Sequence, residues 1–96
     1  MRMLMIFCAG SNVDAVRRLI DAHEVHGYTE IPDLIGSGAT GLHMGTRAHP
    51  GTSALILAAV ERKKADELTT SLGELARTCA PEEGLRVFVL PVERMI

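Results

Sequence analysis

The chain has 96 residues, a formal net charge of -2, and 47% hydrophobic but only 3% aromatic residues. This length suffices for a single core, so one domain is expected over residues 1–96. The acidic balance and the scarcity of stacking rings exclude a nucleic-acid partner, and no apolar stretch has the ~20 residues that insertion into a membrane requires. Two cysteines are too few for a disulfide scaffold, which favours a cytoplasmic location.

The first part of the chain predicts a buried strand followed by a helix. Residues 3–8 (MLMIFC) are a short apolar run of the kind found in buried strands. The helix is expected to begin near Ser11 and to end before Gly27, with its charged residues facing solvent. Its inward stripe consists of Val13, Val16, Ile20 and His23. We therefore expect His23 to lie against the core or at the helix C-terminus.

Residues 28–35 predict a second strand, and Pro32 limits where it can lie. Proline cannot donate a ladder hydrogen bond, so this strand is expected at a sheet edge or at a bulge. The glycine-rich segment that follows contains a G-x-G-x-x-G pattern at residues 36–41. Gly45, Pro50 and Gly51 interrupt the helix that a dinucleotide-binding turn needs, so the pattern does not indicate a Rossmann domain.

The second half of the chain predicts a strand at residues 53–60, a helix at 61–78 and a last strand at 85–90. Pro81 ends the helix and Pro91 ends the strand. The resulting order, βαββαβ, predicts an α+β fold of the ferredoxin-like type. Its four-stranded antiparallel sheet would carry two helices on one face.

Two strands of this sheet are apolar on both faces. Alternate positions of residues 3–8 and of residues 54–58 are apolar on either side, whereas two helices cover only one side. An uncovered face would expose on the order of several hundred Å² of apolar surface. We therefore expect three copies to bury these faces against one another, leaving clefts between subunits beside a long loop at about residues 37–50.

Three segments resemble the nitrogen-regulatory P-II signalling family. These are Gly27-Tyr28-Thr29, Gly36-x-Gly38 and residues 88–93 (FVLPVE). The resemblance implies a cytoplasmic homotrimer that binds adenine nucleotides between subunits and uses its T-loop to regulate a membrane transporter or an enzyme. It implies effector contacts from Thr29, Gly36, Gly38, Arg47, Gly84 and Arg86. It places His43, Met44, Arg47 and His49 on the loop that contacts the target.

The chain departs from the family pattern next to the expected phosphate position. Glu82 and Glu83 stand where the family has a basic, glycine-rich turn, and like charges oppose phosphate binding. The loop also lacks the tyrosine that the family modifies. The effector is therefore left open between an adenine nucleotide (ADP, ATP or AMP) and another anion.

Histidines offer an alternative function. His26, His43 and His49 could bind Cu, Zn or Ni in a trimeric metal-responsive protein. No cysteine or carboxylate accompanies them at a ligand spacing, so a resident metal is not expected. No nucleophile and base occur in a catalytic pattern either, and we expect a regulatory protein that is not an enzyme.

Overall fold

The computed structural model describes residues 1–37, 43–44, 53–79 and 84–96. The chain begins with β1 (Arg2–Ala9), a 3-10 turn (Gly10–Asn12), α1 (Val13–Ala22) and β2 (Thr29–Leu34). Two short strands follow, β3 (Gly36–Ser37) and β4 (His43–Met44). The last elements are β5 (Ser53–Val60), α2 (Arg62–Thr78) and β6 (Leu85–Pro91).

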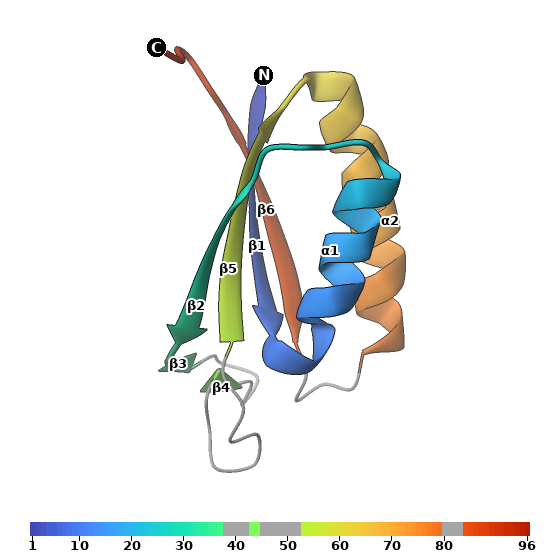
Figure 1. The fold of residues 1–96 in the computed structure, drawn as a ribbon, viewed down its shortest axis with the longest axis vertical. Coiled ribbons are helices and arrows are strands. Elements are labelled where there is room, and N and C mark those ends of the chain that lie inside the picture. The colour runs from blue at the N-terminus through green and yellow to red at the C-terminus, as the bar shows by residue number, and fades with distance from the viewer. Residues whose placement is uncertain (38–42, 45–52, 80–83) are drawn as a thin grey trace.

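The main sheet has four antiparallel strands in the order β2-β5-β1-β6. Central strand β1 pairs on both sides, so Met5 lies opposite Leu57 of β5 and opposite Phe88 of β6. Both helices lie on one face of this sheet (Figure 1). The predicted α+β fold with two helices on one face of an antiparallel sheet is confirmed.

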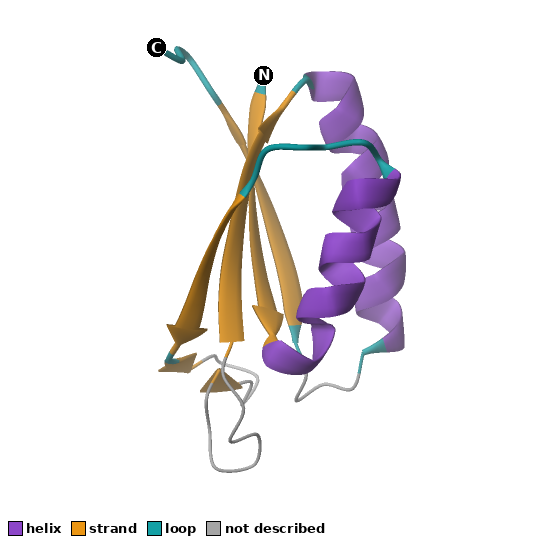
Figure 2. Ribbon diagram, in the orientation of Figure 1, coloured by secondary structure: helices purple, strands orange, loops and turns teal. Residues whose placement is uncertain are grey.

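The helices and the sheet form two layers (Figure 2), and the core residues pack between them. Alternate residues of β1 point into it, and Leu4, Ile6 and Cys8 are fully buried. Each helix packs an apolar stripe against the sheet. The stripe residues of α1 and α2 are Val13, Val16, Ile20, Ala65, Leu68 and Leu72.

Strand β2 is at the sheet edge and also contains an irregularity. Its pairing with β5 shifts register between Ile31 and Leu34. Within this interval Pro32 supplies no amide hydrogen, and Asp33 has a positive φ of 62°. The sequence predicted that the strand with Pro32 lies at a sheet edge or contains a bulge, and β2 does both.

Helix α1 ends in a turn that closes on itself. The Glu24 amide donates to the Asp21 carbonyl (2.9 Å) and the Val25 amide to the Ile20 carbonyl (3.1 Å), which together form a Schellman motif. His23 is the C-cap, as the sequence predicted for a helix C-terminus. Its Nε2 lies 2.9 Å from Ser71 Oγ, so the ring ties α1 to α2.

Two local predictions needed correction. The helix was expected to begin near Ser11, but the chain first makes the 3-10 turn and α1 begins at Val13. Part of the predicted loop is regular: β3 and β4 pair antiparallel, with Gly36 opposite Met44 and Ser37 opposite His43. A short two-stranded ribbon therefore continues from the end of β2, beyond the main sheet.

Candidate functional site

The sheet face away from the helices carries apolar side chains from all four strands. Met3, Met5 and Phe7 of β1 lie in its middle and are half-buried. At its margins Phe88 is 50% exposed, and Ile31 and Leu90 are each 40% exposed. Within the described part of the chain, no element lies over this face (Figure 1). Phe7 and Phe88 pack edge to face on it, with ring centroids 5.9 Å apart.

Two predicted effector residues lie on this face, at opposite edges of the sheet. Thr29 of β2 is opposite Leu57, and Arg86 of β6 is opposite Phe7, which places both on the side of Met5 and Phe88. Because β5 and β1 lie between β2 and β6, three strand spacings, or about 14 Å, separate the two edges. Both residues are exposed. On one copy of the chain the two residues thus form separate halves of the predicted site, which we call half-sites.

The predicted glycines lie at one end of the sheet, where β2 ends and β6 begins. Gly36 belongs to β3 and pairs with Met44. The Gly84 carbonyl accepts a hydrogen bond from the Ala9 amide at 3.3 Å, which fixes the backbone just before β6. The backbone of His43 and Met44 forms β4. Gly38, Arg47 and His49 lie outside the described residues.

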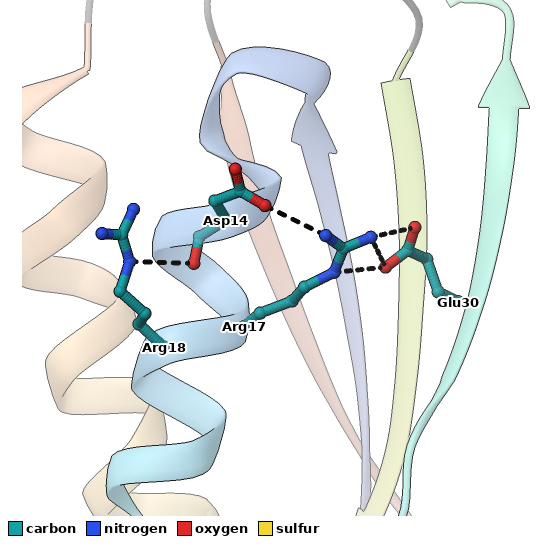
Figure 3. A network of polar contacts seen from close by, with 4 residues as sticks. All are labelled: Asp14, Arg17, Arg18 and Glu30. Carbon is teal, nitrogen blue, oxygen red and sulfur yellow. Dashed lines mark hydrogen bonds and ion pairs between the residues drawn. The ribbon is translucent and has the colours of Figure 1, made fainter.

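An ion pair that the sequence did not reveal joins α1 to β2 (Figure 3). Arg17 Nε donates to Glu30 Oε1 at 2.9 Å, and Nη2 donates to Oε2 at 2.8 Å. Arg17 Nη1 also reaches Asp14 Oδ1 at 3.0 Å. Arg17 is one of the charged helix residues that were expected to face solvent. One sequence signal could have predicted the position of Glu30. Side chains alternate along β2, so Glu30 points to the helix side of the sheet, while Thr29 and Ile31 point to the other side.

The electrostatics of this region are set by that pair and by burial. The hydrogen bonds that Arg17 donates to the Glu30 carboxylate raise the pKa of Arg17, so the guanidinium remains charged. Burial raises the pKa of the Cys8 thiol to about 11, and the Glu30 carboxylate adds to the increase. Cys8 is thus a protonated thiol of the core and does not have the character of a nucleophile.

The alternative metal site gains no support. Among residues 1–37, 43–44, 53–79 and 84–96, no group of three His, Cys, Asp or Glu side chains is placed to hold a metal ion. His26 is exposed. The side chain of His43 and the whole of His49 lie outside what the structure describes. Neither helix is long and apolar enough to span a membrane.

Comparison with known proteins relates the whole chain to one family. The family model described as nitrogen regulatory protein P-II matches residues 1–96. No curated protein matches significantly. Among solved structures, the fold resembles CPII, a nitrogen regulatory PII-like protein from Thiomonas intermedia K12.

Three of the CPII structures show how far the similarity extends. The apo form superposes with a TM-score of 0.70 at 22% identity, covering 92% of this chain and 84% of that one. A form bound to ADP, AMP and bicarbonate gives a TM-score of 0.73 at 25% identity, covering 99% and 94% of the two chains. A form bound to ADP and bicarbonate gives 0.74 at 25%, covering 92% and 81%.

Proposed function

Because the chain belongs to the nitrogen regulatory protein P-II family, we propose that it is a homotrimeric regulator with effector sites between its subunits. The effector would be an adenine nucleotide, accompanied by a small anion. Its binding would set the conformation of the long loop, which would act on a target protein. The family is one of regulatory proteins, in agreement with the expectation that the chain is not an enzyme.

The observation that carries this proposal is the division of the predicted site across the apolar face. Thr29 and Arg86 lie on one face at opposite sheet edges. Cyclic association that buries this face would bring the β2 edge of one copy beside the β6 edge of the next. A cleft at that junction would combine the two half-sites. Assembly would thus bury the apolar surface and complete the binding site in one step.

The chemistry of the half-sites suits a phosphorylated ligand. Arg86 is exposed and forms no ion pair within the described residues, so its guanidinium is available to phosphate oxygens. The backbones of Gly36 and Gly84 lie at the same end of the sheet, and Gly38 and Arg47 would follow on the loop. CPII, which has the same fold, is seen with ADP, AMP and bicarbonate. We therefore propose ADP or AMP together with bicarbonate as the first ligands to test, with ATP as the third nucleotide.

The output would pass through residues 37–50. The ribbon of β3 and β4 continues directly from β2, so a ligand held at the end of β2 would bias the position of the loop. A regulator of this kind needs an effector that binds one loop state more tightly than the other. His43, Met44, Arg47 and His49 would contact the target, a membrane transporter or an enzyme in the cytoplasm.

Calorimetry with ADP, AMP and ATP, each with and without bicarbonate, tests the proposal. We expect micromolar binding of at least one nucleotide. Arg86→Ala should weaken it about tenfold to a hundredfold, the usual effect of losing a charged hydrogen bond. Arg77→Ala is the matched control, because Arg77 is also exposed but lies on α2. Gly38→Ala should also weaken binding if the loop base approaches the phosphates.

Two results would count against the site. Absence of binding by the wild-type protein would reject the nucleotide effector. Equal affinities of the Arg86→Ala and Arg77→Ala variants would remove Arg86 from the site while leaving nucleotide binding itself intact.

A further inference from the structure

We infer that Arg17 and Glu30 are positioning residues whose ion pair holds β2 in the arrangement that the effector requires. The inference rests on the proposed function, since β2 carries Thr29 and leads into the loop. Neither side chain is assigned a contact with the effector. Their role is to hold the strand that makes those contacts.

The geometry of the pair is well suited to fixing a strand. Two parallel hydrogen bonds join the guanidinium to the carboxylate, so both the distance and the relative orientation of α1 and β2 are constrained (Figure 3). The Glu30 side chain is only 23% exposed. The second contact of Arg17 differs, because Asp14 is 77% exposed and lies on the same helix, three residues earlier. Only the contact with Glu30 links two elements.

Strand β2 needs such a link more than the other strands do. It lies at the sheet edge and pairs only with β5 in the main sheet. The register shift between Ile31 and Leu34 interrupts that pairing close to the loop. Among the described residues, no other side chain of β2 forms a hydrogen bond or ion pair with a described partner. The ion pair thus adds a second attachment of β2, to helix α1, on the side of the sheet that the helices cover.

The position of Glu30 couples this attachment to the effector side. Glu30 lies between Thr29 and Ile31, and successive residues of a strand point to opposite faces. A displacement of Glu30 toward or away from α1 would therefore move the backbone of Thr29 and Ile31, whose side chains lie on the apolar face of the sheet. Loss of the ion pair would therefore change the position of Thr29, although no residue on the apolar face of the sheet is substituted.

The test uses the full chain and substitutions that alter the pair with little change of volume. Glu30→Gln removes the charge but keeps the shape, and Arg17→Lys keeps the charge but loses the paired donors. Asp14→Asn is the matched control, because it alters the other contact of Arg17. We expect the first two variants to bind ADP at least fivefold more weakly than wild type, with Asp14→Asn within twofold. The exchanged pair Arg17→Glu/Glu30→Arg should recover part of the loss.

Amide NMR spectra of the ligand-free variants supply a readout that does not depend on ADP. The signals of Thr29 and Ile31 should shift in Arg17→Lys, which changes no residue of β2, while those of the β1–β6 ladder stay in place. If either variant fails to fold by circular dichroism, the other decides.

The outcomes separate this inference from the proposed function. If wild type binds ADP and both variants bind within twofold of it, the positioning role is overturned and the proposed function stands. If wild type binds no nucleotide, the proposed function is wrong, and the amide signals alone decide. Unchanged Thr29 and Ile31 signals would then overturn the positioning role as well.

Discussion

At the scale of single residues, the end of α1 shows how one backbone angle closes a helix. Glu24 occupies the left-handed region with a φ of 59°, which is required for the two hydrogen bonds of the Schellman motif. A side chain with a Cβ is disfavoured there by roughly 1 to 2 kcal/mol. The buried Val25 that follows packs into the core, so the chain tolerates the strain in order to turn toward β2.

Glycine at this position should therefore stabilise the protein. We expect Glu24→Gly to raise the free energy of unfolding by about 0.5 to 1 kcal/mol, since relief of strain is partly offset by the greater entropy of the unfolded chain. Urea denaturation measures the change. Ala22→Gly, within the last turn of the same helix, should instead lower stability by about 1 kcal/mol. A loss of stability in both variants would show that the Glu24 side chain contributes more than its backbone strain costs.

Cys8 predicts a pH dependence of stability. Its pKa is raised from 9.0 to about 11 by burial, so between these values the folded protein retains a proton that the unfolded chain has lost. The stabilisation is complete below pH 9 and declines as the pH rises toward 11. At pH 10.5 the loss should be about 2 kcal/mol, measured by urea denaturation relative to pH 8.

The Cys8→Ala variant isolates this effect from the other groups that titrate at high pH. It should be less stable than wild type at pH 8, because a buried side chain is shortened. Its further loss between pH 8 and 10.5 should be smaller than that of wild type by about 2 kcal/mol. Parallel pH profiles of the two proteins would contradict the raised thiol pKa.

At the scale of elements, the apolar stripe of α2 seals the core, and its stabilising effect varies along the helix. Leu68 is fully buried near the middle of α2, whereas Leu75 is only partly buried near its end. We expect Leu68→Ala to lower the free energy of unfolding by about 2 to 5 kcal/mol, because it leaves a cavity between helix and sheet. The same substitution at Leu75 should have a clearly smaller effect. Denaturation of the two variants side by side checks this ranking, and equal losses would contradict it.

The elements also show where sequence reasoning succeeded and where it stopped. Apolar periodicity identified both helices, because burial of one helix face imposes that period, and short apolar runs identified the central strands. Pro32 correctly restricted β2, since the missing amide hydrogen is a property of the residue itself. The 3-10 entry to α1 was missed. The residues Ser11-Asn12-Val13-Asp14 permit a helix start at Ser11, but the chain makes a 3-10 turn at Gly10–Asn12 and α1 begins at Val13.

At the scale of the whole molecule, the apolar sheet face predicts assembly. Phe88 is half exposed in the isolated subunit, so a charge there should disturb contacts between copies more than the subunit itself. We expect wild type to sediment at about three times the chain mass of 10.4 kDa, and Phe88→Glu to shift toward the single chain. Nucleotide affinity should fall with it, because the half-sites would separate.

Thr70→Glu is the control for this experiment, since it adds the same charge to an exposed position on α2. Circular dichroism should show native helix content in both variants. A wild-type protein that remains a single 10.4 kDa chain at micromolar concentration would remove the basis for clefts between subunits.

The amino-acid sequence alone determined the order of the elements, the apolar character of both sheet faces and the family resemblance, since periodicity and short motifs are local properties. Only the tertiary structure decided which sheet edges Thr29 and Arg86 occupy, and that Arg17 pairs with Glu30. Arg17 and Glu30 are 13 positions apart in the sequence, and they are in contact because of the way α1 packs against the sheet. Such a contact depends on how the helix layer packs on the sheet, and no pattern along the chain predicts it.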